Sequence, residues 1–121
     1  MLAEARKLGD LRNTSIPAFH TDGSWQKGEK RYCYIVMDFM NMNLSDLMKR
    51  NVSGTFSERT TLLVTLQMIR LLKSIHTNGY LHRDLKPENF LIGISEVTRR
   101  MIYIVDFGLA GKYLESDGQH I

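Results

Sequence analysis

The sequence predicts an α+β fold from three observations along the chain. The stretch "SWQKGEKRYCYIVMDF" (24–39) predicts two strands around a turn at Lys27-Gly28-Glu29. Apolar residues recur at helical spacing between Ser57 and Asn78, which predicts one long amphipathic helix. The run "MIYIV" (101–105) is apolar and rich in β-branched residues, as in a buried strand. A chain that joins such strands to a long helix belongs to the α+β class.

The long helix has recognisable ends and one expected apolar face. Ser57 is a good N-cap residue because its hydroxyl can accept a bond from the free N–H groups of the first turn, and Asn78-Gly79 is a common helix end. By itself the apolar stripe predicts core packing and carries no functional signal. The side chains of this stripe are Leu62, Leu66, Ile69, Leu72 and Ile75. Shorter helices are expected around 44–48 and within 2–11.

Composition and charge exclude several classes of protein. Lysine and arginine total 16 against 13 acidic residues, and a formal net charge of +3 is too small and too dispersed to indicate a nucleic-acid partner. The longest apolar candidate, residues 62–75, is interrupted by polar and charged side chains and cannot be a lipid-facing helix, and no signal peptide is visible. We therefore expect no membrane partner and an intracellular location, cytoplasmic or nuclear. The oligomeric state is left open.

Two side chains of the predicted hairpin carry structural expectations. Cys33 is the single cysteine, so an intrachain disulfide is excluded. Its position in an apolar run predicts a small buried hydrophobic side chain. Trp25 is expected to pack on a face of the sheet.

The stretch "YLHRDLKPENFLIG" (80–93) places polar residues in an order that composition alone does not explain. A surface loop would account for its polarity and for its proline and glycine. Asp84, Lys86 and Asn89, however, lie two and three residues apart, and Pro87 stiffens the chain among them by fixing its φ. A stiff loop can hold three polar groups on one target.

A further polar group follows the strand expected at 101–105. Asp106 stands at the end of that strand, and Phe107 and Gly108 come next. A carboxylate at the mouth of a strand, followed by a glycine that lets the backbone turn, suits a divalent cation with oxygen ligands. We therefore expect Asn89 and Asp106 to share a magnesium site.

Taken in order, the two segments match H-R-D-L-x-x-x-N (82–89) followed by D-F-G (106–108), and the sequence resembles a protein kinase. Lys86 favours the serine/threonine class. The stretches "HRDLKPENFLIG" and "VDFGLAGKY" resemble the casein kinase I and tau-tubulin kinase group, and the similarity spans essentially the whole chain. Gly111 departs from this group, in which a basic or polar residue is usual.

The resemblance implies a protein-kinase-like two-lobed fold and a role for each motif residue. Asp84 would accept the proton of a Ser or Thr hydroxyl of a protein substrate, and Lys86 would reach the transferred phosphate of ATP. Asn89 and Asp106 would hold Mg²⁺ ions that bridge the ATP phosphates. His82 is expected to pack beside Phe107 and not to act as a base.

The resemblance also places the adenine site. Met37 would guard the back pocket, the backbone of Asp38, Phe39 and Met40 would form the hinge that pairs with adenine, and Leu91 would be the apolar floor under the ring. An ordinary strand end, with methionines that fill gaps, explains Met37, Met40 and Met42 about equally well, and leucine is also an ordinary strand residue. Arg83, next to the expected base, could bind a phosphorylated loop, a modification that this group does not generally require.

The expected organisation is a partial kinase domain truncated at both ends. Residues 1–37 would be a remnant of the small lobe, 38–43 the hinge, and 44–121 the first part of the large lobe. The family's Gly-rich loop, strand lysine and helix glutamate have no counterpart in the sequence. Two functions therefore compete: a serine/threonine kinase of which this is a part, and a noncatalytic binding module derived from one. The motif residues favour the first for the parent protein, and the missing phosphate-binding parts favour the second for these 121 residues alone.

Overall fold

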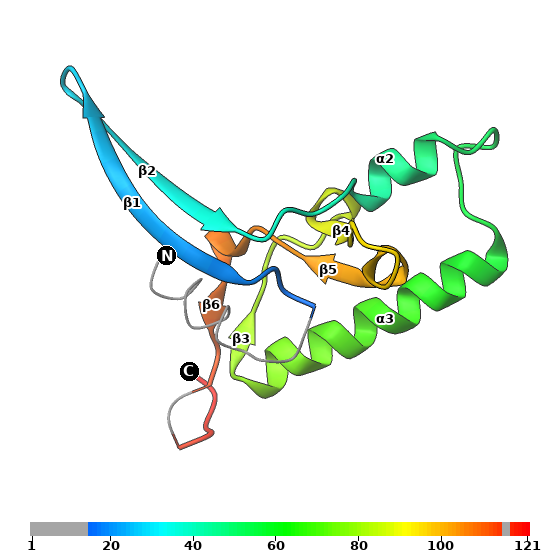
Figure 1. The fold of residues 1–121 in the computed structure, drawn as a ribbon. Helices are drawn as coiled ribbons and strands as arrows, with labels where there is room; N and C mark the ends of the chain where they lie inside the picture. The colour runs from blue at the N-terminus through cyan, green and yellow to red at the C-terminus, as the bar shows by residue number, and fades with distance from the viewer. Residues whose placement is uncertain (1–14, 115–116) are drawn as a thin grey trace.

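The computed structural model describes residues 15–114 and 117–121 and has the predicted α+β composition (Figure 1). The short helix expected within 2–11 lies outside the described residues. In chain order the elements are β1 (Phe19–Lys27), β2 (Lys30–Met37), α2 (Leu44–Lys49), α3 (Glu58–Thr77), β3 (Tyr80–Leu81), the 3-10 turn η1 (Pro87–Asn89), β4 (Phe90–Ile92), η2 (Thr98–Arg100), β5 (Ile102–Ile104), η3 (Phe107–Leu109) and β6 (Gly111–Lys112).

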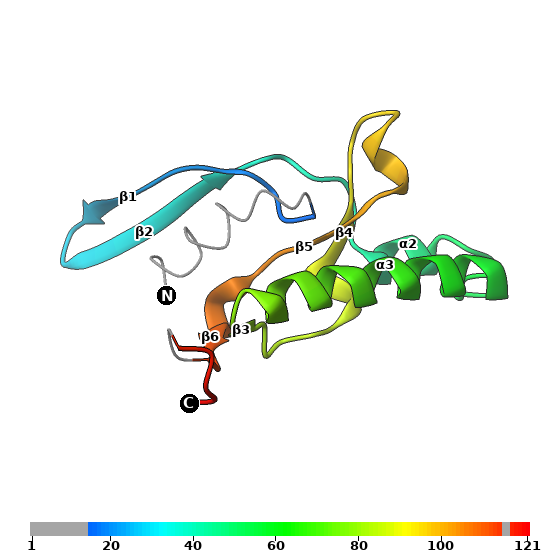
Figure 2. The same ribbon diagram turned by 90° about the horizontal axis from the view of Figure 1, so that it is seen from below.

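The strands β1 and β2 form the predicted hairpin, whose turn points away from the helices α2 and α3 (Figures 1 and 2). Gly28 adopts a φ of 61° in the turn, a conformation that glycine reaches without a steric penalty. Trp25 pairs with Tyr32 across the strands, and their rings stack with centroids 5.0 Å apart. The expected packing of Trp25 on a sheet face is confirmed, and β1 begins earlier than expected, at Phe19.

The predicted burial of Cys33 is wrong, because its side chain is exposed. Every residue of β2 is exposed. A two-stranded ribbon needs a further strand or a helix to cover a face, and the described residues place none on this hairpin. The apolar run therefore predicted the strand correctly and its burial incorrectly.

Both predicted ends of α3 are confirmed. Ser57 has an extended backbone, and its Oγ accepts a hydrogen bond of 3.2 Å from the backbone N–H of Thr60. At the other end Asn78 is the C-cap residue and Gly79 has a φ of 80°, which lets the chain reverse into β3. The short helix expected around 44–48 is α2.

The predicted apolar face of α3 is wrong for three of its five members. Leu62, Leu66 and Ile69 are 64%, 44% and 59% exposed. The face that packs on the core carries Val64, Met68, Leu71, Leu72 and Ile75. Both sets satisfy helical spacing, so periodicity could not distinguish the covered face from the exposed one. Within residues 15–114 and 117–121, no helix is both long and apolar enough to cross a membrane.

The core lies between α3 and the paired strands β4 and β5. Its buried apolar side chains are Leu44, Leu71, Ile75, Tyr80, Phe90, Ile102, Ile104, Phe107 and Ala110. The Gln67 side chain fastens α3 to β5: its amide donates to the carbonyl of Arg100 at 3.1 Å and accepts from the N–H of Ile102 at 3.0 Å. The end of η2 and the start of β5 are thus bonded to the long helix through two backbone groups.

The Ser57 cap leads to a stability prediction. Replacing Ser57 by Ala leaves the Thr60 N–H without its acceptor and should lower the free energy of unfolding by about 1 kcal/mol. Urea unfolding of both proteins measures the difference. Ser74→Ala removes a hydroxyl from the opposite end of the same helix, and a loss equal to that of Ser57→Ala would contradict the capping role.

Candidate functional site

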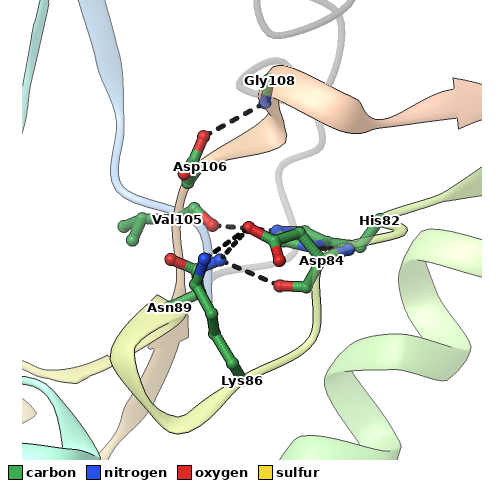
Figure 3. A network of polar contacts seen from close by, with 7 residues as sticks. All are labelled: His82, Asp84, Lys86, Asn89, Val105, Asp106 and Gly108. Carbon is green, nitrogen blue, oxygen red and sulfur yellow. Dashed lines mark hydrogen bonds and ion pairs between the residues drawn. The ribbon is translucent and has the colours of Figure 1, made fainter.

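The pairing of β4 with β5 brings the two polar segments together. Phe90 pairs with Ile104, and one step further the N–H of Val105 donates to the carbonyl of Asn89 at 3.0 Å. Asn89 ends η1, and Asp106 follows Val105 directly. Figure 3 shows the result: the loop that bears Asp84 and the turn that bears Asp106 lie side by side.

The Asp84 carboxylate is held by the two residues that the loop spacing singled out. Oδ2 of Asp84 accepts from Nζ of Lys86 at 2.8 Å and from Nδ2 of Asn89 at 3.0 Å. Nδ2 of Asn89 also donates to the backbone carbonyl of Asp84 at 2.9 Å. One amide nitrogen thus fixes both the backbone and the side chain of Asp84, and the three residues form one cluster.

The ion pair shifts the protonation of both partners. The hydrogen bond from Lys86, helped by the one from Asn89, holds the pKa of the Asp84 carboxyl below its ordinary value of 3.8. The hydrogen bond to Asp84, together with the negative charges of Asp84 and Asp106, raises the pKa of Lys86 above 10.5. Asp84 is therefore a carboxylate at neutral pH, and its side chain keeps 27% of its surface open to an incoming group.

Two oxygen atoms at this site are available to a cation. Both neighbours of the Asn89 amide nitrogen are acceptors, which fixes the orientation of this almost buried side chain and leaves Oδ1 without a donor among the described residues. Oδ1 of Asp106 accepts from the N–H of Gly108 at 3.3 Å. Oδ2 of Asp106 makes no hydrogen bond with any of the described residues. These two oxygens come from the two residues predicted as metal ligands.

His82 joins the backbone of the loop that bears Asp84 to the segment that bears Asp106. Its ring is 1% exposed and meets the ring of Phe107 edge-on, with centroids 4.9 Å apart, which confirms the predicted packing. Nε2 lies 2.9 Å from the carbonyl of Val105, and Nδ1 lies 3.3 Å from the N–H of Asp84. Since a carbonyl only accepts and an N–H only donates, the neutral ring with its proton on Nε2 satisfies both contacts.

The expected adenine floor lies beside the expected hinge. The N–H of Asn41 donates to the carbonyl of Ile92 at 3.0 Å, and the N–H of Ile92 donates to the carbonyl of Met42 at 3.1 Å. An isolated bridge joins Asn43 to Leu91. Leu91 is thereby brought next to the segment that follows Met40. The N–H of Met40 itself makes no hydrogen bond within the described parts of the chain.

Asp38 has a structural task that the sequence did not indicate. Its N–H donates to the carbonyl of Ala18, and its Oδ2 accepts from the N–H of Ala18, each at 3.0 Å. Oδ1 lies 2.7 Å from Nε2 of His20. These contacts hold the pKa of the Asp38 carboxyl below 3.8, chiefly through the Ala18 bond. The side chain of Asp38 thus closes the open end of the hairpin, directly after Met37, which is 44% exposed.

The Lys86 contact predicts a change in the titration of Asp84. In Lys86→Met the pKa of Asp84 should rise toward 3.8 because the strongest bond to the carboxylate is lost. The effect on stability follows from linkage. A carboxyl group whose pKa is lower in the folded protein than in the unfolded chain stabilises the fold above the unfolded pKa, and this stabilisation is lost as the pH falls through the folded pKa. Carboxyl carbon shifts recorded by NMR through the acidic range measure the pKa.

The matched control for that titration is Lys49→Met. Lys49 pairs with Asp46 at 3.6 Å on α2, so its loss removes an ion pair of the same kind elsewhere. The Asp84 titration should not respond to it. An unchanged Asp84 curve in Lys86→Met would show that Lys86 does not hold the carboxylate in solution.

Comparison with known proteins assigns the chain to a family. Residues 4–120 match the family "Protein kinase domain". A probable serine/threonine-protein kinase of Dictyostelium discoideum is 43% identical over 88 residues, which are 73% of this chain and 18% of that protein. A putative casein kinase I of Caenorhabditis elegans is 33% identical over 119 residues, which are 98% of this chain and 34% of that protein. The resemblance seen in the motifs is thus confirmed, and the chain, which covers only part of a kinase domain, belongs to the protein kinase family.

Proposed function

We propose that this protein is a serine/threonine protein kinase that transfers the γ-phosphoryl group of ATP to hydroxyl groups of protein substrates. The family implies the use of ATP and of protein substrates. The observation that carries the proposal is the Asp84 carboxylate, ionised and oriented by Lys86 and Asn89 and still partly open to solvent. A carboxylate in this state can receive a hydrogen bond from a Ser or Thr hydroxyl and orient its oxygen.

In the proposed reaction each cluster residue has one task. The substrate oxygen forms a bond to the γ-phosphorus, the bond from that phosphorus to the bridging oxygen of ADP breaks, and the hydroxyl proton passes to Asp84. Lys86, whose pKa is raised, stays cationic. It would reach the transferred group and neutralise part of its charge. Asn89 keeps Asp84 in place through its amide nitrogen. Positioning and charge neutralisation account for most of the catalysis in this reaction class.

The donor set of the site fits magnesium. Asn89 and Asp106 offer one free oxygen each, and no cluster of three or more His, Cys, Asp or Glu side chains that could hold a metal occurs among residues 15–114 and 117–121. Mg²⁺ commonly keeps several waters and takes only one or two protein ligands plus substrate phosphates. When bound, the metal would neutralise charge on the ATP phosphates, while Asn89 and Asp106 orient it.

The same proposal extends to the organisation of the chain. The β1–β2 hairpin would be part of the small lobe, 38–43 the hinge, and the remainder from Leu44 on the first part of the large lobe of a two-lobed kinase. The N–H of Met40, which makes no hydrogen bond within the described residues, would bond adenine, and Leu91 would lie under the ring. Support comes from the isolated bridge between Asn43 and Leu91, which brings Leu91 next to residues 38–43.

Asp84→Asn should abolish phosphotransfer while ATP binding persists, because the amide keeps the size of the side chain but cannot accept the proton as a carboxylate does. A loss of roughly two to four orders of magnitude in kcat is expected for a missing general base. Turnover and ATP affinity are measured on the protein expressed from its full coding sequence. Glu96→Gln, which removes a carboxylate that is 84% exposed, is the control, and turnover in Asp84→Asn equal to that of the control would refute the role.

Asp106→Asn should weaken nucleotide binding with Mg²⁺ by at least about tenfold, since even an outer-shell partner of a metal can be worth that much. Binding without Mg²⁺ should change little. The Asn side chain can still accept from the N–H of Gly108, so the turn is kept and only the charge is lost. Asp117→Asn is the matched control, because Asp117 accepts from the N–H two residues on in the same way. Equal losses with and without metal would make Asp106 a purely structural residue.

A further inference from the structure

Arg83 lies between two residues of the site and has a strained backbone. Its φ is 66°, in the left-handed region that a residue with a side chain rarely adopts. The only other such non-glycine residue in the described parts of the chain is Asp106, with a φ of 63°. Strain of this kind costs on the order of 1–3 kcal/mol and persists where the surrounding contacts enforce it.

The side chain of Arg83 makes a hydrogen bond that joins the loop of Asp84 to the turn that carries Asp106. Nε of Arg83 donates to the backbone carbonyl of Leu109, the last residue of the turn η3. Leu109 lies three residues after Asp106, and Arg83 directly precedes Asp84. The bond therefore links the backbone beside the proton acceptor to the turn that carries the expected metal ligand.

The guanidinium group of Arg83 occupies the space that a side chain at Gly111 would fill. A Cβ at position 111 would lie 2.7 Å from Nη2 and 2.8 Å from Cζ of Arg83, closer than such atoms approach each other. The φ of Gly111 is not positive, so its backbone would accept alanine, and its pairing with Leu81 in β3–β6 does not require glycine. The nearest obstacle to a side chain at this position is therefore Arg83, the end of a flexible side chain that can move away.

We propose that Arg83, seated on the backbone of Gly111 and bonded to the Leu109 carbonyl, is a latch that positions the Asp106 turn against the catalytic loop. A backbone carbonyl is present in every state of the protein, so the latch needs no modification of the chain. Gly111, the departure from the casein kinase I pattern, is the residue that makes the latch possible here. Arg83 and Gly111 are thus positioning residues, and this step rests on the proposed function.

The latch is tested with Gly111→Ala, Arg83→Met and the double variant, in the protein expressed from its full coding sequence. Amide hydrogen exchange without nucleotide is the first measurement, at the N–H groups of Ala110 and Tyr113, which bond to Phe107 and Gly79. Each single change should speed exchange at these amides by about tenfold, the size of one lost hydrogen bond to a charged donor. The double variant should exchange no faster than either single one, because both changes break the same contact.

The second measurement is phosphotransfer at varied Mg²⁺. Each single change should lower kcat/KM by about tenfold at limiting Mg²⁺ and by less at saturating Mg²⁺, because displacing the turn of Asp106 would weaken metal binding. Gly23→Ala is the matched control: its Cβ would meet the Tyr34 hydroxyl at 2.5 Å, a collision of the same kind in the distant hairpin. That control should leave both measurements unchanged.

The outcomes separate the latch from the proposed function. Unchanged amide exchange in Gly111→Ala, or effects that add in the double variant, would overturn the latch. Faster exchange together with unchanged transfer would overturn its positioning role. Faster exchange and non-additive effects, in a protein that transfers no phosphate even as wild type, would support the latch and sink the kinase proposal instead.

Discussion

The register of β4 on β5 is the constraint on which the site depends. Because Phe90 faces Ile104, the backbone of Asn89 must meet that of Val105, and Asp106 follows at the same edge. A slip of either strand by one residue would turn the buried side chains of that strand outward, and the full burial of Phe90 and Ile104 opposes such a slip. The hydrophobic core and the polar site are therefore fixed by the same few backbone bonds.

A second layer of contacts turns that register into a rigid polar cluster. Asn89 and His82 are buried, and all their side-chain nitrogen atoms have partners, so each costs little to bury and neither is free to rotate. The amide of Asn89 holds Asp84 from one side, and the ring of His82 holds the backbone N–H of Asp84 from the other. Asp84 can therefore leave 27% of its side-chain surface open and still keep one orientation, as the proposed contact with a substrate requires.

Contacts between residues close in the sequence were predictable from the sequence. Which faces of the strands and helices are buried was not. The Ser57 cap and the hairpin turn depend on neighbours within four residues, and both were predicted correctly. The burial of Cys33 and of Leu62 depends on which layers lie over a strand or helix face, and an apolar pattern records only that a face is apolar. In the cluster the motif spacing identified the residues that meet, but their roles in catalysis remain predictions. The Arg83 bond to Leu109 joins residues 26 apart and leaves no local pattern.

The lowered pKa of Asp84 limits when a proton can move in the proposed reaction. An alcohol is a very weak acid, and a carboxylate stabilised by Lys86 is a weak base, so Asp84 cannot remove the hydroxyl proton before the reaction begins. The proton becomes acidic only as the oxygen bonds to phosphorus and loses electron density. Transfer to Asp84 must then come late, which suits a loose transition state with little bond formation to the nucleophile. In the proposed reaction Asp84 would therefore act first as a hydrogen-bond acceptor that orients the substrate oxygen. The bonds from Asn89 and Lys86 that weaken it as a base also hold it in place.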